Sequence, residues 1–291
     1  MGEASVVGRR MQIHPLSEAI GTEMTGIDLA RPLDDAAFAH IRAAWLERGI
    51  LLIHGQAHLS PEEFIAASRR FGPLDEHDLP DYCLPGYPEI AIVSNVREQG
   101  RYIGAPKAGR HWHSDSQYLG RPPSASLLLA REVPPIEGDT LFANMIAAYD
   151  GLDEAMKHRI AGLRINHSRA RAYSLYHPER PPLTAEQIAA LPDVRHPIVR
   201  THPETGRKAL YVGGAQHGGT VVGMSLDEGN ALIAELRDFA TQPRFVYEHR
   251  WSVGDLIVWD NRSTMHCALP FDEERHRRIM HRTQIVGDVP Y

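Results

Sequence analysis

The segment VWDNRSTMH, residues 258–266, is an apolar strand that leads through a polar turn to a histidine. Short apolar runs rich in Val, Ile, Leu and Tyr recur along the chain, and such runs are typical of β-strands. We expect strands at residues 50–53, 90–93, 125–130, 209–212, 245–249, 256–259 and 279–286. In the second half of the chain these runs do not alternate regularly with helical patterns. The order therefore favours an antiparallel sandwich or barrel over a doubly wound parallel sheet.

Helical patterns are fewer and well separated. Residues 34–48 begin with aspartates suited to an N-cap, and their apolar side chains are spaced as on one face of a helix. Residues 60–71 open with Ser-Pro-Glu-Glu, which combines a capping serine, a proline at the first helical position and a glutamate at the third. Further helices are expected at residues 152–163 and 225–240. The expected fold class is mainly β with flanking helices.

Residues 169–192 differ in character from the rest of the chain. Prolines at positions 178, 181, 182 and 192 stand among polar and aromatic residues, and one short helical turn is expected at 184–191. Long irregular insertions in compact domains often serve as lids or binding loops. We expect a lid-like insertion here, with a plain surface excursion between strands as the alternative.

Length and composition limit the class of protein. The chain of 291 residues can bury a substantial core, and we expect a single catalytic domain spanning residues 1–291. A hydrophobic content of 43% and a charged content of 23% are ordinary for a soluble globular protein. A formal charge of -6 argues against nucleic acid as a partner, and the apolar runs are too short to cross a membrane. The chain shows no signal-peptide core and only two cysteines, far apart, so a cytoplasmic location is expected.

A second motif, RHWHSDS at residues 110–116, provides candidate metal ligands. Side chains alternate faces in an extended strand, so His113 and Asp115 are expected on one side, with α-carbons about 6 to 7 Å apart. A histidine hydrogen-bonded to a carboxylate would give the same spacing, so the motif needs a third ligand. His266, at the end of the opening segment, can supply it. Two histidines and one carboxylate form the facial triad of non-haem iron(II) oxygenases, which leaves three adjacent coordination positions open.

The chain resembles the taurine and 2,4-dichlorophenoxyacetate dioxygenase family of iron(II)- and 2-oxoglutarate-dependent enzymes. The resemblance runs over nearly the whole chain through short motifs in the same order. They are residues 21–29 (GTEMTGIDL), 70–74 (RFGPL), 112–115 (WHSD), 138–141 (GDTL), 200–208 (RTHPETGRK), 259–262 (WDNR) and 277–282 (RRIMHR). The implied fold is a double-stranded β-helix, which is a cupin-like jelly roll with helices packed outside it. This agrees with the strand-rich pattern.

The family pattern implies a catalytic role for each matching residue of the metal motif. His113, Asp115 and His266 match the ligands of Fe(II). The implied co-substrates are 2-oxoglutarate and O2. The implied reaction hydroxylates a C–H bond of a small organic anion while 2-oxoglutarate is decarboxylated to succinate and CO2.

A set of polar residues matches the binding site for the co-substrate. Arg278 and Arg282 are four residues apart in an expected strand, which places them on one face. A planar guanidinium grips a carboxylate with two hydrogen bonds, so an arginine at the bottom of the site would bind a dicarboxylate. By resemblance, Arg278 and Thr140 hold the distal carboxylate of 2-oxoglutarate. Arg282 matches an arginine beside the iron-bound end of the co-substrate and the substrate anion.

Candidate substrate contacts lie near these motifs. His77 follows Phe71-Gly72 at the offset of the sulfonate-binding histidine of taurine dioxygenase. Ser116 and Tyr118 follow the metal motif and are expected to shape the pocket. His111 shares a face with the metal ligands if the strand stays regular, so it is a candidate ligand, a neighbour of the ligands or a substrate contact.

The expected substrate is a small anion: an aryloxyalkanoate or other carboxylate, a sulfonate or a sulfate ester. Cleavage of the hydroxylated product is an alternative to stable hydroxylation. Pro80 and Gly109 stand where taurine dioxygenase carries a tyrosine and an asparagine, which argues against taurine itself. The alternative function is a zinc or manganese hydrolase or isomerase on the same jelly roll, and a 2-oxoglutarate sensor is a third hypothesis. The resemblance also implies a homo-oligomer, either a dimer or a tetramer.

Overall fold

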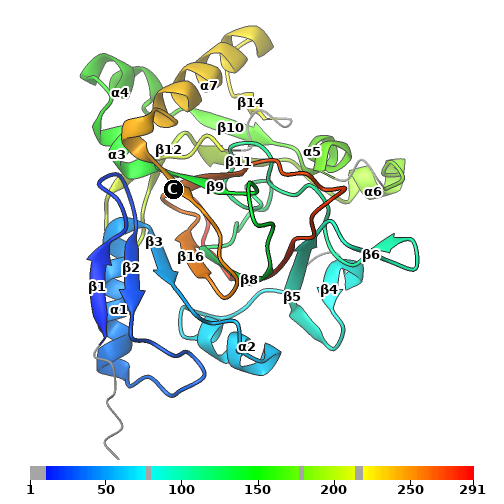
Figure 1. Cartoon of the computed structure of the whole chain (residues 1–291). Helices are drawn as coiled ribbons and strands as arrows, with labels where there is room; N and C mark the ends of the chain where they lie inside the picture. Colours follow the sequence, from blue (N-terminus) through cyan, green and yellow to red (C-terminus); the bar gives the residue numbers. More distant parts are fainter. Residues whose placement is uncertain (1–10, 77–79, 177–179, 214–218) are drawn as a thin grey trace, which may run out of the picture.

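A computed structural model describes residues 11–76, 80–176, 180–213 and 219–291 of the chain (Figure 1). Its largest element is an 8-stranded sheet in which strands far apart in the sequence are neighbours. In spatial order the strands are β1 (Gln12–Pro15), β2 (Thr22–Thr25), β3 (Ile50–Ile53), β16 (Leu256–Asp260), β8 (Ala125–Glu132), β18 (Ile279–Ile285), β5 (Tyr87–Ser94) and β4 (Cys83–Leu84). All neighbouring pairs are antiparallel except β2 and β3. The expected predominance of antiparallel pairing is confirmed.

A smaller sheet covers one face of the large one. It contains β15 (Val246–His249), β9 (Thr140–Asn144) and β17 (Thr264–Ala268). Phe142 of β9 shares a buried apolar cluster with Leu128 and Ile257 of the large sheet. The next residue along each of those large-sheet strands, for example Leu129, points into a different cluster. This alternation gives the large sheet two apolar faces, and the two-sheet core is the expected jelly roll.

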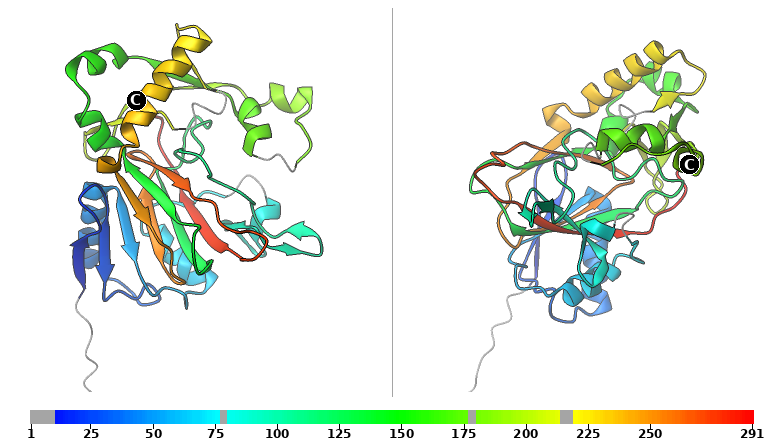
Figure 2. Two further views of the ribbon diagram at one scale, coloured as in Figure 1. Left: turned by 45° about the horizontal axis from the view of Figure 1, so that its top comes forward. Right: turned by 90° about the vertical axis from the view of Figure 1, so that its right-hand side faces the viewer.

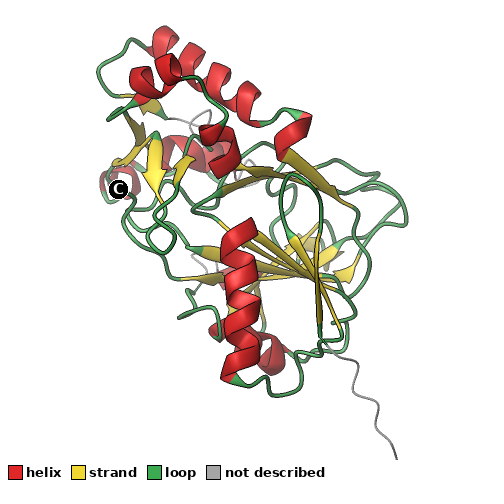
Figure 3. Cartoon of the chain, turned by 90° about the vertical axis from the view of Figure 1, so that its left-hand side faces the viewer, coloured by secondary structure: helices red, strands yellow, loops and turns green. Residues whose placement is uncertain are grey.

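Helices cover the other face of the large sheet. In α1 (Asp35–Arg48) and α2 (Pro61–Arg69), Phe38, Trp45 and Phe64 pack against the second apolar face. Helix α1 starts where Asp34 accepts a hydrogen bond from the backbone N–H of Ala37. In Figure 3, α1 lies across the strands of the sheet. The predicted capping box of α2 is present.

The remaining helices and short strands form a layer at the opposite end of the molecule from α1 and α2 (Figures 1 and 2). The helices are α3 (Met145–Asp150), α4 (Glu154–Ile160), α5 (Arg169–Tyr176), α6 (Ala185–Ala189) and α7 (Leu226–Ala240). The strands are β10 (Arg164–His167), β11 (Val194–Pro197), β12 (Val199–Thr201), β13 (Lys208–Leu210) and β14 (Thr220–Val221), while β6 (Arg97–Glu98) and β7 (Arg101–Tyr102) form a separate hairpin. Short 3-10 turns occupy Pro80–Tyr82 and Pro243–Phe245. Ile165, Leu232 and Leu236 pack here in one cluster with Met265 of β17.

Two local expectations were wrong. The stretch 169–192 is not irregular apart from one turn, because α5 precedes the predicted turn at α6. The prolines begin at position 178, after α5 has ended, so they do not prevent that helix. The motif at 110–116 is not a regular strand: only His113 forms a bridge, to His266, and Ser116 has a positive φ of 48°. Among the described residues, we find no helix with both the length and the apolar character that a bilayer crossing requires.

Candidate metal centre

Three side chains from distant parts of the sequence meet at one end of the sandwich. His113, Asp115 and His266 are all buried, and each offers a ligand atom within 4.8 Å of the other two. The Nε2 atoms of His113 and His266 lie 3.6 and 3.7 Å from Oδ1 of Asp115. One ion can therefore touch all three atoms, and the donor set of two imidazoles and a carboxylate suits iron(II).

The backbone, rather than strand alternation, brings these ligands together. His113 N–H donates to the carbonyl oxygen of His266 at 3.0 Å, and His266 N–H donates to that of His113 at 2.8 Å. Behind this bridge the chain passes so closely that a Cβ atom on Gly213 would lie 2.5 Å from the backbone nitrogen of Ser114. Glycine at 213 thus allows its own segment to lie directly against the backbone of His113 and Ser114.

The histidine rings are oriented for metal binding. Nδ1 of His113 donates to the carbonyl oxygen of His111 at 2.7 Å, which leaves Nε2 as the free lone pair. The ring of His266 packs 4.7 Å from that of Trp259. Burial lowers the pKa of His266 to about 3, and the neighbouring His113 contributes to this shift. A neutral imidazole is the form that binds a metal.

Asp115 is the anionic member of the site. Burial alone would raise its pKa, but the Arg282 guanidinium and the two histidines more than offset burial and hold the pKa well below its usual range. Nη1 of Arg282 lies 3.6 Å from Oδ1 of Asp115. The second oxygen, Oδ2, accepts a hydrogen bond of 2.6 Å from the hydroxyl of Ser126. The carboxylate is therefore charged and held on both sides.

The ligands lie in a pocket of about 200 Å³ that also contains the predicted co-substrate residues. Oγ1 of Thr140, on β9, accepts a hydrogen bond from Nε1 of Trp251 at 2.9 Å. Arg278 is buried, and burial lowers its pKa to about 10. Within the described residues, Nε of Arg278 has no hydrogen-bond partner. A buried guanidinium with an unsatisfied N–H fits an anionic ligand, and beside Thr140 it fits the distal carboxylate of 2-oxoglutarate.

The other predicted site residues are placed as follows. Ser116 and Tyr118 line the pocket, whereas His111 is not among the lining residues of the described chain. His77 lies outside the described residues. Arg282 lines the pocket beside Asp115. These positions leave the functional roles as predictions.

Several residues of the site were not predicted. Ser126 and Asn261 hydrogen-bond to Asp115, and Trp251 hydrogen-bonds to Thr140. Gln284 lines the pocket and hydrogen-bonds to Ser126. The available signal was the WDNR motif at residues 259–262, which contains Asn261. The other residues carry no local pattern, because their function depends on contacts between distant strands.

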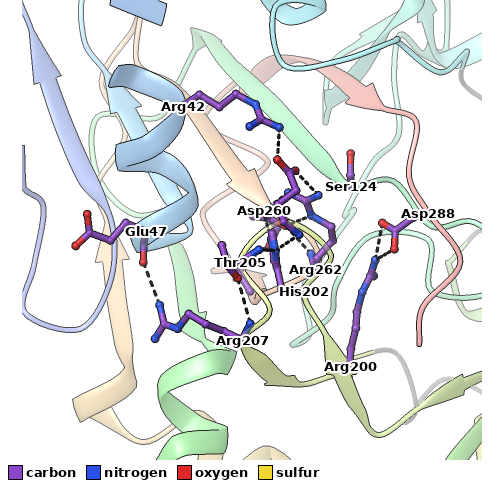
Figure 4. Close-up of polar contacts among 12 residues, drawn as sticks. Arg42, Glu47, Ser124, Arg200, His202, Thr205, Arg207, Asp260, Arg262 and Asp288 are labelled. Carbon is purple, nitrogen blue, oxygen red and sulfur yellow. Dashed lines mark hydrogen bonds and ion pairs between the residues drawn. The ribbon is translucent and has the colours of Figure 1, made fainter. Parts of the chain in front are cut away.

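The turn that joins β16 to β17 is fixed by a buried ionic network (Figure 4). Oδ2 of Asp260 accepts hydrogen bonds from Nη2 of Arg262 at 2.6 Å and from Nε2 of His202 at 2.9 Å. Arg262 also pairs with Glu204, which in turn pairs with Arg42 of α1. This network anchors the turn immediately before the strand that carries His266.

Comparison with known proteins identifies a family. The family described as taurine catabolism dioxygenase TauD, TfdA family matches residues 12–284. The chain is 37% identical over 289 residues to the (S)-phenoxypropionate/alpha-ketoglutarate-dioxygenase of Sphingobium herbicidovorans, with 95% of each chain covered. It is also 37% identical over 283 residues to the alpha-ketoglutarate-dependent 2,4-dichlorophenoxyacetate dioxygenase of Cupriavidus pinatubonensis, covering 94% of this chain and 96% of that protein. The crystal structure of AAD-2 in complex with Mn(II) and N-oxalylglycine matches with a TM-score of 0.79 and 32% identity, over 97% of this chain and 99% of that chain.

Proposed function

The chain belongs to the TauD, TfdA family of dioxygenases, and from this premise we propose that its primary substrate is a small aryloxyalkanoate with a single carboxylate. As a member of this family it is an iron(II)- and 2-oxoglutarate-dependent dioxygenase. In the proposal, His113, Asp115 and His266 bind the iron. The observation that carries the proposed substrate class is the position of Arg282, a cation inside the pocket at the metal end.

The reaction needs the co-substrate to be held in one orientation. His113, Asp115 and His266 would hold iron(II), which when bound would supply the attachment point for the 2-oxo acid end of 2-oxoglutarate and the oxidative chemistry for hydroxylation of a C–H bond. Arg278 and Thr140 hold the far carboxylate. Because the Trp251 N–H already occupies one lone pair of the Thr140 hydroxyl, that hydroxyl can direct its own proton at the carboxylate. Burial of this end excludes the water that would compete for Arg278.

The remaining walls of the pocket favour an amphiphilic monoanion. Tyr118 and Leu119 line it from the loop after the metal motif, and Tyr173 lines it from α5. Such walls suit an aromatic or alkyl body. Asp75 and Glu76 also line the pocket, and their charge would repel a second anionic group on the substrate.

The position of oxidation follows from this orientation. When the substrate carboxylate binds Arg282, one substrate carbon lies nearest the metal end. It is the carbon that joins the carboxylate to the ether oxygen. Hydroxylation of that carbon gives a hemiacetal or hemiketal, which breaks its bond to the aryl oxygen and releases a phenol and a 2-oxo acid. Net ether cleavage is therefore the expected outcome.

The alternative of a metal hydrolase or isomerase is not supported. The named relatives are dioxygenases that use alpha-ketoglutarate. A hydrolase would also have no use for a buried Arg278 that shares the pocket with Thr140 and whose Nε has no hydrogen-bond partner among the described residues.

The proposal is tested by succinate release from protein prepared anaerobically, loaded with iron(II) and then given 2-oxoglutarate and air. Aryloxyalkanoates should stimulate succinate release most strongly, and the labelled oxygen of ¹⁸O2 should appear in succinate. Sulfate esters, sulfonates, phosphonates and aryloxy-dicarboxylates form the comparison panel. Stronger coupling to a sulfonate or sulfate ester than to any aryloxyalkanoate would contradict the substrate class.

We extend the proposal to assembly and location. A homodimer or homotetramer is expected by analogy with the family, and light scattering coupled to gel filtration measures it. A cytoplasmic location is expected, because the substrate and 2-oxoglutarate are small metabolites, and cell fractionation tests it.

A further inference from the structure

We propose that Ser126 is a positioning residue that keeps Asp115 as a one-oxygen ligand of the metal. The inference rests on the proposed role of Asp115 in iron binding. It assigns a function to a serine of β8 that lies outside every motif of the sequence and is fully buried, at 0% exposure.

The two oxygens of Asp115 face different partners. Oδ1 points toward the other ligands, at 3.6 Å from Nε2 of His113 and 3.7 Å from Nε2 of His266. Oδ2 is bonded to the Ser126 hydroxyl at 2.6 Å. A hydrogen bond of this length to a carboxylate is a strong, charge-assisted one. It keeps Oδ2 turned away from the point where Oδ1 and the two imidazoles converge.

The hydroxyl of Ser126 has no freedom to turn its proton elsewhere. A serine hydroxyl has one proton and two acceptor sites. Both acceptor sites face amide donors, because Nδ2 of Asn261 lies 3.0 Å away and Nε2 of Gln284 lies 3.3 Å away. The single proton is thereby directed to Asp115.

The orientation of the Asn261 amide is fixed in its turn. Its Oδ1 accepts from Nε1 of Trp259 at 2.9 Å and from the backbone N–H of Asp115 at 3.2 Å. Both partners are donors only, so this atom must be the amide oxygen, and Nδ2 must face Ser126. Trp259, Asn261 and Ser126 thus form a directed chain of hydrogen bonds that ends on Asp115.

This chain of hydrogen bonds matters because a carboxylate can also bind a metal through both of its oxygens. If Asp115 binds through one oxygen, the triad leaves three coordination positions open. The 2-oxo acid would take two of them, and dioxygen would take the third. With two oxygens, Asp115 would take one of those positions. Ser126 therefore protects the position that dioxygen needs.

The test is Ser126→Ala, which removes one buried atom. Mn(II) replaces iron as the probe, and the water-proton relaxation it causes reports how many exchangeable waters it carries. We expect the variant to bind Mn(II) but to lose about one third of the inner-sphere relaxation of the parent protein, as one of three open positions is filled. With 2-oxoglutarate added, the variant should retain no exchangeable water where the parent retains one.

Ser68→Ala is the matched control, because Ser68 is equally buried. Its hydroxyl donates to the carbonyl oxygen of Phe64 and accepts from the hydroxyl of Thr283, and neither partner is a proposed metal ligand. It should relax water as the parent does. Asn261→Asp is the second variant: its carboxylate accepts instead of donating, so it competes with Asp115 for the serine proton and should lower the relaxation in the same direction. Unchanged relaxation in both site variants would overturn the role of Ser126. Failure of the parent itself to bind Mn(II) would instead contradict the metal centre.

Discussion

His113, Asp115 and His266 each have a neighbouring contact that fixes the orientation of the side chain. The carbonyl oxygen of His111 fixes the tautomer of His113, the hydroxyl of Ser126 turns Asp115, and the ring of Trp259 packs against His266. Side chains placed in this way are held before an ion arrives. Removing a ligand should therefore affect metal binding more than folding.

The first prediction concerns the ligands. His266→Ala should abolish succinate formation, because two remaining donors hold iron too weakly for turnover, while the melting temperature of the metal-free protein changes little. Calorimetric titration with Co(II) measures the lost binding. His40→Ala is the control, since this exposed residue of α1 bonds to the carbonyl oxygen of Ala36 in its own helix. Full activity in His266→Ala would refute the ligand assignment.

The second prediction concerns the co-substrate. Arg278→Lys should raise the KM for 2-oxoglutarate by about tenfold or more, because an ammonium cannot make the paired hydrogen bonds of a guanidinium. Thr140→Val should raise the same KM by a smaller factor. The kcat at saturating 2-oxoglutarate should fall much less than kcat/KM in both variants. Steady-state succinate assays measure this split, and an unchanged KM in Arg278→Lys would contradict the assignment.

At the scale of elements, the turn between β16 and β17 is the most constrained part of the site. Asp260 and its partner Arg262 are both buried. Hydrogen bonds from Arg262 and His202 occupy both oxygens of the Asp260 carboxylate (Figure 4). The following residue, Asn261, reaches Asp115 from the same turn. A single short loop therefore couples the stability of the sandwich to the geometry of the metal site.

The third prediction follows from that turn. Asp260→Asn should lower the free energy of unfolding by about 3 to 5 kcal/mol, since it removes the buried counter-charge of Arg262 and leaves only the partly exposed Glu204 to pair with it. Glu204→Gln, whose side chain is 29% exposed, should cost about 1 kcal/mol or less. Guanidinium denaturation of the two variants measures the difference. If both variants lose the same small amount of unfolding free energy, Asp260 is not the residue that stabilises the ionic network.

Some elements could be predicted from local sequence and others could not. The Ser-Pro-Glu-Glu start of α2 carries its own capping groups, so residues close in sequence decide it. The loop of His113 has a strand-like pattern but takes its shape from a backbone bridge to His266 and from close contact with Gly213. Helix α5 was missed because nearby prolines dominated the composition of its segment. Its role as a lid stays a prediction.

At the scale of the whole molecule, the partly buried His281 and the buried His167 affect stability as a function of pH. Burial lowers the pKa of His281 to about 4, helped by the adjacent Arg131, whose Nε donates to His281 Nδ1 at 3.2 Å. Burial likewise lowers the pKa of His167 to about 3, with His196 contributing. Both rings are therefore neutral in the folded protein near pH 7.

The fourth prediction gives the sign of that dependence. An unfolded histidine titrates near pH 6.5, so below this pH the unfolded chain binds protons that the folded chain excludes. The free energy of unfolding should fall as the pH drops from 6.5 toward 4, by up to about 1.4 kcal/mol per pH unit for each histidine. His281→Asn keeps an acceptor for Arg131 and should reduce the slope by about one proton. Denaturation at pH 7.5, 6 and 5 measures it, and an unchanged slope would contradict the assignment.

The reaction class could be predicted for the whole chain, but the substrate could not. The metal motif, Thr140 and the two arginines lie in short recognisable patterns, and the family comparison confirms the dioxygenase class. The other pocket walls come from α5 and from the loop around Tyr118, where the sequence gives residue types without their distances. Ser126 shows the same limit, since its partners Asn261 and Gln284 come from two other strands or turns.

The backbone bridge between His113 and His266 has a consequence for metal supply. Backbone hydrogen bonds of the protein bring the ligands together without any ion. The assembly of the site therefore does not select one divalent ion over another. For such nitrogen and oxygen donors, divalent cobalt, nickel, copper and zinc generally bind more tightly than iron(II). The protein is thus exposed to mis-metallation, and zinc should act as a competitive poison. Which ion occupies the site then depends on the relative availability of these ions as well as on their affinity.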